Sequence, residues 1–333
     1  MIPEPTTGEI ADIAIRLQAL FAEIEDIGRT PAGGYRRFVA TAEDVALRSW
    51  FQAQAARLKL RYEVDPAGNQ WAWWGEREPG YVVVGSHLDS VPDGGAFDGP
   101  LGVLSALVAV EMMQEQKWQP AVPLAIVNFT EEEGGRFPLA CRGSRILTGA
   151  ADPATVADLR DSDGIRLGDV CTELAADPQR IAEIGRYVEL HIEQGRNLAP
   201  MGERLAVANA IWPHGRWLID LPGVADHAGT TRMEDRTDAL VKAARIILAV
   251  QEAAIDAGAV ATVGKISNEP GAINAISSRA TLSLDARAAT ESTLAAVLAP
   301  ITAAVQAEGG EISQVSHTPE TAFDPGLCAQ LSE

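Results

Sequence analysis

Three apolar segments that each end in histidine or carboxylate residues constrain the fold of this chain more than any other feature. The segments are "YVVVGSH" at 81–87, "PLAIVNFTEEE" at 123–133 and "RYVELHIEQG" at 186–195. Continuous apolar strands of this kind are buried on both faces, and helical patterns lie between them. This alternation predicts an α/β fold with a mainly parallel sheet covered by helices on both sides.

The remaining periodicity divides the chain into two parts. In the first part we predict helices at 8–26 and 42–58, a helix that begins at Pro100, and a hairpin at 61–74 whose turn lies at 66–69. From about residue 209 the predicted order is β-α-β-β-α-β, which is typical of a small α+β domain. Its predicted elements are strand 215–221, helix 235–258, strand 260–266, strand 279–287, helix 290–308 and strand 311–316.

Charge and composition exclude several classes of partner. The formal net charge is −19, which argues against nucleic acid and against anionic membrane surfaces as partners. No apolar segment approaches the roughly 20 residues of a membrane helix, and the acidic N-terminal segment lacks the basic region of a secretory signal. The three cysteines, at 141, 171 and 328, are too far apart to form a CxxC pair. We therefore expect free thiols and a cytoplasmic protein.

The strand ends combine imidazole with carboxylate groups. In open α/β sheets, ligands bind beyond the carboxyl ends of the strands. The ends in question supply His87, then the run Glu131–Glu132–Glu133, and then His191. Imidazole and carboxylate together are the ligands that zinc and similar divalent ions take, so the sequence predicts a metal site. The first acidic residue of this group, Glu131, is expected to be a helix-start or solvent-exposed charge.

Two aspartates follow His87 closely. Asp89 lies two residues further along the chain, so it can face the same side and hold the imidazole in one tautomer. The loop at 93–97 contains Gly94 and Gly95, and its flexibility allows Asp98 to return to the same place. A carboxylate there could bridge two metal ions about 3.5–4 Å apart, which is the geometry of two-metal hydrolysis.

Several motifs resemble the M20 metallopeptidase clan. They are "GSHLDSVPDGGAFDGPLGVLSAL", "TEEEGGRFP", "HIEQG", "ADHAGTTRM" and "NAISSRATLSLDAR". They occur in the family's order, span nearly the whole chain, and are most similar to the amidohydrolase branch: N-carbamoyl-L-amino acid hydrolases, β-ureidopropionases and allantoate amidohydrolases. The resemblance implies a di-metal catalytic domain at 1–208 plus 323–333, and an inserted lid and dimerisation domain at 209–322.

The resemblance also implies the metal ligands and the general base. His87, Asp98 and His191 would surround one ion, and Asp98 would bridge to a second ion held by Glu133. The ions would be zinc, manganese or cobalt. Glu132 would be the general base that activates the attacking water.

Further roles in substrate binding are carried over from the family. Gln194, Asn274, Arg287 and, more weakly, Arg216 would contact the substrate, and the Arg287 fork matches a carboxylate. His227 would stabilise the developing oxyanion in the active site of a partner subunit, which implies a homodimer.

Some residues favour plainer interpretations. His214 and His317 are expected at the surface rather than at a metal. Cys141 beside Arg142 could be an activated thiol, but no histidine motif accompanies it, so a structural role is favoured. Trp71, Trp73 and Trp74 are interpreted as packing of the hairpin.

The resemblance implies a further segment after the lid, with a histidine that completes the Glu133 site. The last histidine here is His317, so we expect an incomplete second metal site and low activity. The preferred function is a metal-dependent amidohydrolase that cleaves the carbamoyl amide of N-carbamoyl-L-amino acids and releases ammonia and carbon dioxide. The alternatives are allantoate amidohydrolase, an M20 dipeptidase or aminoacylase, and an inactive dimeric remnant.

Overall fold

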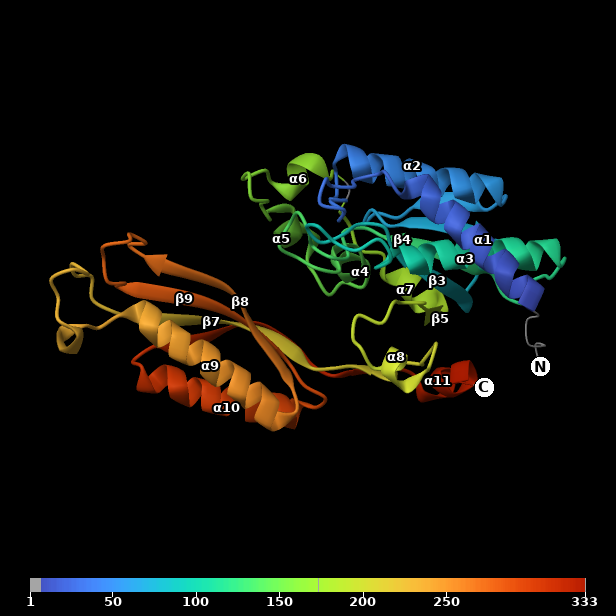
Figure 1. Ribbon diagram of the computed structural model, residues 1–333. Coiled ribbons are helices and arrows are strands. Elements are labelled where there is room, and N and C mark those ends of the chain that lie inside the picture. The colour runs from blue at the N-terminus through green and yellow to red at the C-terminus, as the bar shows by residue number, and fades with distance from the viewer. Residues whose placement is uncertain (1–6, 173, 333) are drawn as a thin grey trace. The chain divides into compact units, whose positions relative to one another are not determined.

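The computed structural model describes residues 7–172 and 174–332, and these residues form two compact units (Figure 1). Unit 1 ends at Gly195 and unit 2 begins at Arg196. Among the described residues, no helix is both long and apolar enough to cross a membrane. The domain boundary expected at residue 209, and the assignment of 323–333 to the first domain, stay predictions.

Unit 1 contains a five-stranded sheet in the order β1-β2-β4-β3-β5. Its strands are β1 (Arg61–Val64), β2 (Gln70–Trp74), β3 (Tyr81–His87), β4 (Leu124–Phe129) and β5 (Ile184–Val188). Its helices are α1 (Thr7–Ile24), α2 (Ala42–Arg57), α3 (Pro100–Glu115), α4 (Arg142–Leu147), α5 (Pro153–Ala157), α6 (Leu167–Val170) and α7 (Pro178–Glu183). Strands β4, β3 and β5 are parallel, so their carboxyl ends lie at one edge of the sheet.

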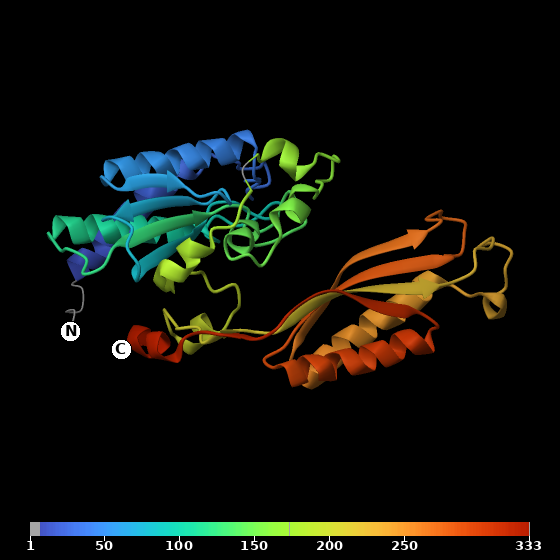
Figure 2. The ribbon, with the colours of Figure 1, turned by 180° about the vertical axis from the view of Figure 1, so that it is seen from behind.

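Helices lie on both faces of this sheet (Figure 2), and alternating side chains of its strands contribute to a separate core on each face. On β4, Ile126 packs with α1, α2 and α3, whereas its neighbours Ala125 and Val127 pack with Phe137 and the residues of α4 to α6. Since successive strand residues point to opposite faces, continuous apolar strands require two covering layers. The prediction of a sheet covered on both sides is therefore confirmed.

Two details of this sheet differ from the sequence prediction. The sheet is mixed rather than mainly parallel, because the hairpin of β1 and β2 joins it antiparallel to β4. The third apolar strand ends at Val188 instead of at residue 190, so His191 lies in the segment beyond β5 and not directly at its end. Strand β5 lies at the edge of the sheet, and β3 is its single neighbour in the strand order. The strand ends where its pairing with β3 ends, at Val188.

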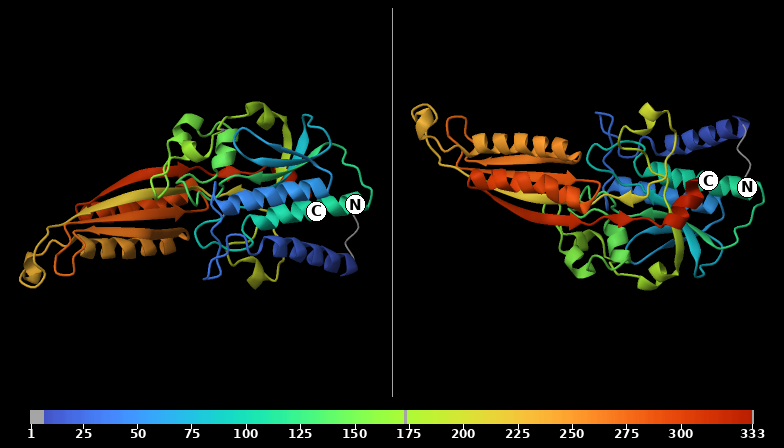
Figure 3. Two further views of the ribbon diagram at one scale, coloured as in Figure 1. Left: turned by 90° about the horizontal axis from the view of Figure 1, so that it is seen from above. Right: turned by 90° about the horizontal axis from the view of Figure 1, so that it is seen from below.

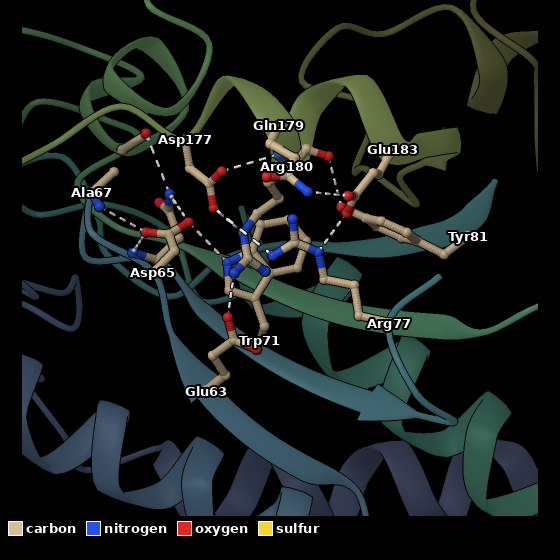
Figure 4. Close-up of polar contacts among 12 residues, drawn as sticks. Glu63, Asp65, Ala67, Trp71, Arg77, Tyr81, Asp177, Gln179, Arg180 and Glu183 are labelled. Atoms are coloured by element: carbon tan, nitrogen blue, oxygen red, sulfur yellow. Dashed lines mark hydrogen bonds and ion pairs between the residues drawn. The ribbon is translucent and has the colours of Figure 1, made fainter. Parts of the chain in front are cut away.

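A buried ion network anchors α7, which leads directly into β5 (Figure 4). The Arg180 guanidinium is only 2% exposed, lies 4.8 Å from the centre of the Trp71 ring, and is ion-paired with Glu63 of β1 and with Asp177 at 3.2 Å. Tyr81 of β3 donates a hydrogen bond of 2.9 Å to the Arg180 carbonyl. These contacts tie the start of β5 to three other strands, and they thereby set the position from which the chain continues to His191.

Unit 2 contains a four-stranded antiparallel sheet in the order β10-β7-β9-β8, with α9 and α10 on one face (Figure 3). Its principal elements are β7 (His214–Pro222), α9 (Ala239–Ala257), β8 (Val260–Glu269), β9 (Arg279–Arg287), α10 (Glu291–Ala307) and β10 (Glu311–Thr318). The shorter elements are α8 (Leu198–Met201), β6 (Ala210–Ile211), η1 (Met233–Asp235), β11 (Thr321–Ala322) and α11 (Pro325–Ser332). The predicted β-α-β-β-α-β order is confirmed.

The sequence of α9 explains why it covers this sheet. Its buried residues Ala243, Ile246 and Val250 recur at the helical period and face the sheet core, while Asp238 caps the helix by accepting from the Leu240 amide at 2.9 Å. Unit 2 therefore has its own hydrophobic core, separate from the two cores of unit 1.

Candidate metal centre and active site

The centre of the candidate site is His87, the last residue of β3. Its ring is buried, and Nδ1 lies 3.0 Å from the Asp89 carbonyl oxygen and 3.5 Å from the Asp89 carboxylate. Nε2 points to the other side, 3.6 Å from Glu132 Oε2. Burial lowers the pKa of His87, but the Asp89 carboxylate and the nearby Glu132 and Glu133 carboxylates outweigh it and raise the pKa to about 9.

Glycine at position 99 allows this ring to pack against the loop that carries Asp98. The φ of Gly99 is +83°, and a Cβ atom added there would lie 2.4 Å from the His87 ring. A side chain at this position would displace the imidazole. Gly99 thus allows the start of α3 to pack against the His87 ring.

The carboxylates of Glu132 and Glu133 extend from the loop that follows β4. Asp89 fixes the backbone of this loop, because its two carboxylate oxygens accept hydrogen bonds from the Glu132 amide at 3.0 Å and the Glu133 amide at 3.1 Å. The pKa of Glu133 is raised to about 6, first by burial and then by the surrounding carboxylates of Glu132, Asp98 and Asp89, despite the opposing effect of His87. The sequence predicted Asp89 as a partner of His87, and in the structure its carboxylate contacts both the imidazole and the amides of the acidic loop.

His191 and Gln194 meet at Asp98. His191 Nε2 lies 3.2 Å from Asp98 Oδ1, and Gln194 donates a hydrogen bond to Asp98 Oδ2. Asp98 is therefore the carboxylate that joins the segment beyond β5 to the segment beyond β3.

The chemistry of these donors fits a divalent metal ion. One ligand atom each from His87, Glu132 and Glu133 lies within 4.8 Å of the others. Burial is the main cause of the raised pKa of Glu133, and repulsion between these closely gathered carboxylates adds to it, so a cation would relieve that repulsion. His87, Glu132 and Glu133 are the residues that this geometry gathers for such an ion, with nitrogen and oxygen donors suited to zinc or manganese, whereas Asp98 and His191 are paired with each other outside this group.

The expectation that Glu131 is a helix-start or solvent-exposed charge is wrong. Glu131 is 2% exposed and forms an ion pair of 2.6 Å with the equally buried Arg142, and it accepts a hydrogen bond from the Phe137 amide at 3.0 Å. Its φ is +51°, an unusual conformation for a residue with a long side chain. The turn at Glu131 directs this carboxylate inward, so that the next two carboxylates of the run face the metal centre.

Cys141 lies beside the candidate base, but it is not an activated thiol. Its Sγ donates to Glu132 Oε1 at 3.1 Å. Burial, and then the Glu132 carboxylate, raise the pKa of Cys141 to about 12, so the thiol stays protonated. The preference for a structural role over a nucleophilic one agrees with this geometry.

In unit 2, His227 and Asn274 lie on neighbouring segments. An isolated bridge pairs His227 with Ala275, and the Ala228 amide donates to the Asn274 carbonyl at 2.9 Å. The Gly229 amide donates to His227 Nδ1 at 3.0 Å. A ring nitrogen that accepts a hydrogen bond carries no proton, so in the neutral imidazole Nε2 carries it and can donate.

Arg216 and Arg287 share one carboxylate in unit 2. Asp285 lies 3.4 Å from Arg216 Nε and 3.1 Å from Arg287 Nε. Both guanidinium groups stay largely exposed, so their terminal nitrogens can bind an anion. The nearby His214 is the cross-strand partner of Arg287, and its Nδ1 contacts the Trp212 carbonyl at 2.9 Å. His317 Nε2 lies 3.2 Å from the Glu291 carboxylate. Neither His214 nor His317 belongs to the group of His87, Glu132 and Glu133 found among the described residues.

Metal titration tests the ligand set. We expect His87→Ala to weaken zinc or manganese binding by about 100-fold or more, because losing even a partner of a ligand typically costs 10–100-fold. Calorimetry of the metal-free chain measures this, and His317→Ala is the matched histidine control. Unchanged affinity in His87→Ala would remove this residue from the site.

Comparison with known proteins gives consistent matches. The family described as peptidase family M20/M25/M40 matches residues 83–324. An N-carbamoyl-L-amino acid amidohydrolase from Geobacillus stearothermophilus is 37% identical over 82% of this chain and 69% of its own length. An allantoate amidohydrolase from Bacillus subtilis is 34% identical over 78% of this chain and 65% of its own length.

A solved structure shares the architecture. The crystal structure of a hydantoinase/carbamoylase family amidase from Burkholderia ambifaria matches with a TM-score of 0.80 and 30% identity, over 96% of this chain and 82% of that one. The chain spans between 57% and 69% of the length of the curated relatives it matches.

Proposed function

The chain belongs to peptidase family M20/M25/M40, and on that premise we propose that it is a metal-dependent amidohydrolase acting on the carbamoyl amide of N-carbamoyl-L-amino acids. The observation that carries the proposal is the group formed by His87, Glu132 and Glu133, whose ligand atoms lie within 4.8 Å of one another. The named activity of the Geobacillus relative supports the substrate class. The products would be ammonia, carbon dioxide and an L-amino acid.

A divalent ion bound here would polarise the carbamoyl carbonyl and lower the pKa of water. Glu132 would accept the proton of the attacking water and pass it to the leaving nitrogen. The 3.1 Å hydrogen bond from Cys141 to Oε1 leaves Oε2, the oxygen nearer to His87, available for this transfer. The contacts of Asp89 with the Glu132 and Glu133 amides would keep both carboxylates in place during the reaction.

The residues proposed to bind the substrate are those that the family resemblance assigns to this role. Arg287, aided by Arg216, would bind the α-carboxylate, because a guanidinium matches a carboxylate with two parallel hydrogen bonds. The Nε2 proton of His227 is suited to the oxygen that becomes negatively charged when water attacks the carbonyl. Gln194 and Asn274 would donate to the remaining polar atoms of the substrate.

Ammonia release from a substrate panel tests the proposal. We expect N-carbamoyl-L-amino acids to be hydrolysed in the presence of zinc, manganese or cobalt ions, and EDTA to stop the reaction. Allantoate is the second substrate to include, because the Bacillus subtilis relative is named for that activity. Hydrolysis of allantoate alone would select that second function, and no release from any member of the panel would reject both.

The two metal positions should differ in affinity. His87 and His191 with Asp98 provide two nitrogen donors, whereas Asp98 and Glu133 provide only oxygen donors, which bind zinc less well. Zinc titration should therefore give one tight and one weak step. Two equally tight steps would contradict this assignment.

Dimerisation through residues 209–322 is proposed from the edge strand β8. Its outer edge has no partner strand among the described residues of unit 2, and Val260 and Ile266 of this strand are 56% and 46% exposed. Natural proteins cover or pair such edges. We expect a dimer at micromolar concentration by light scattering, and a mixture of Glu132→Gln and His227→Ala chains should regain activity. A monomer would contradict the proposal.

A further inference from the structure

A pocket of about 360 Å³ lies beside the C-terminal half of α1 in unit 1. Its walls come from α1, from the segment that contains Tyr35 and Arg37, and from the loop that precedes Asp98. The lining combines aromatic rings with charged groups. The residues that matter for its chemistry are Phe21, Glu25, Arg29, Tyr35, Arg37 and Phe97.

Arg37 is the unusual group of this pocket. It is 3% exposed, and its guanidinium lies 4.2 Å from the centre of the Tyr35 ring. Nε donates to the Ile27 carbonyl at 2.9 Å and Nη2 donates to the Ile24 carbonyl at 2.7 Å. The third nitrogen, Nη1, donates to no group of the described residues and is not fully buried, and none of their carboxylates is ion-paired with Arg37.

This buried charge has incomplete compensation. The two carbonyls lie at and just beyond the C-terminal end of α1, whose partial negative charge offsets only part of a full positive charge. Burial lowers the pKa of Arg37 to about 10, and the nearby Tyr35 opposes this only weakly. A buried cation without an anion is costly, so an anion that reaches Nη1 would be held by a charge-assisted hydrogen bond.

The other residues that line the pocket favour one chemical class of anionic ligand. Phe21 and Phe97 meet edge to face with ring centres 5.1 Å apart, so they offer an apolar surface. The second cation, Arg29, is already paired with Glu25, and together they add no net charge. A phosphate group carries up to two negative charges and several acceptor oxygens, which is more than this lining compensates, whereas a carboxylate can pair with one open guanidinium nitrogen and water. We propose that this pocket binds a small monocarboxylate with an aromatic or aliphatic body, independently of the metal centre.

The test uses the full chain in EDTA, so that carboxylates cannot bind a metal ion instead. Saturation-transfer NMR with 3-phenylpropionate should give a dissociation constant on the order of 1 mM, the range expected for a ligand of this size. The uncharged 3-phenylpropanamide should bind at least about tenfold weaker, because it lacks the charge that Arg37 recognises. Comparing these two ligands requires no change to Arg37, which also caps α1.

Two variants locate the binding. Ala96→Trp should abolish binding, because Ala96 lines the pocket and a large side chain there would fill it. Phe97→Ala removes an exposed ring and should weaken binding severalfold, whereas Trp118→Ala, a change to an exposed aromatic residue outside the pocket, should leave it unchanged. Equal affinity for the acid and the amide, equal affinity of Ala96→Trp and the unmodified chain, or the absence of saturable binding would each overturn the proposal.

Discussion

Replacing Glu132 by glutamine should lower turnover by about 10²–10⁴-fold while metal content stays close to that of the unmodified chain. Glutamine has the size of glutamate and can still accept the hydrogen bond that Cys141 donates at 3.1 Å. It cannot take a proton from water, however, so the loss would be confined to the chemical step. The drop should therefore appear in kcat rather than in KM.

Two measurements make this prediction specific. Ammonia release gives the kinetic constants, and mass spectrometry of the purified chain gives the metal content. Glu115→Gln, at an exposed position of α3, is the matched control and should leave both unchanged. Turnover retained in Glu132→Gln would exclude this residue as the base, and metal lost together with turnover would make it a ligand instead.

Replacing Arg142 by alanine should lower the free energy of unfolding of unit 1 by about 3–5 kcal/mol at pH 8, because it leaves a buried carboxylate without its cation. Burial raises the pKa of Glu131 to about 7 even with Arg142 in place, and the arginine is the largest effect that opposes this rise. Without it the pKa of Glu131 rises further. A carboxyl with a raised folded-state pKa loses stability as the pH rises through that value, so the destabilisation should be smaller at pH 5 than at pH 8.

Urea unfolding of the metal-free chain at the two pH values measures this effect. Arg166→Ala is the control, because Arg166 is paired with Asp158 at the surface and should contribute less than about 1 kcal/mol. An Arg142→Ala chain as stable as the control, or a loss that does not depend on pH, would show that the buried pair does not hold the acidic loop.

The position of the candidate site could be predicted from the sequence, because it follows from topology. Once β3, β4 and β5 are recognised as buried strands, their carboxyl ends must share one edge, which gathers His87, Glu132–Glu133 and the segment that carries His191. The split β-α-β-β-α-β order of unit 2 was likewise visible in alternating periodicity and turn residues.

The different surroundings of the three glutamates in "TEEE" could not be predicted from the sequence. Three consecutive glutamates have the same chemistry, and only the long-range pairing with Arg142 distinguishes Glu131 as the buried one. The left-handed backbone conformation at Glu131 has no local sequence pattern either, since the position is not glycine or asparagine. The ion pair with Arg142, a residue more than ten positions further along the chain, decides which of the three carboxylates face the candidate metal centre.

The separate hydrophobic cores of the two units determine what a melting experiment on this chain can report. Each core can lose its packing on its own, so the chain need not unfold in one cooperative transition and a single melting temperature is not well defined. Tryptophan fluorescence is weighted toward unit 1, which holds Trp50, Trp71, Trp73, Trp74 and Trp118. Unit 2 holds only Trp212 and the buried Trp217. Emission would therefore follow chiefly unit 1, and differential scanning calorimetry would be needed to detect the unfolding of unit 2.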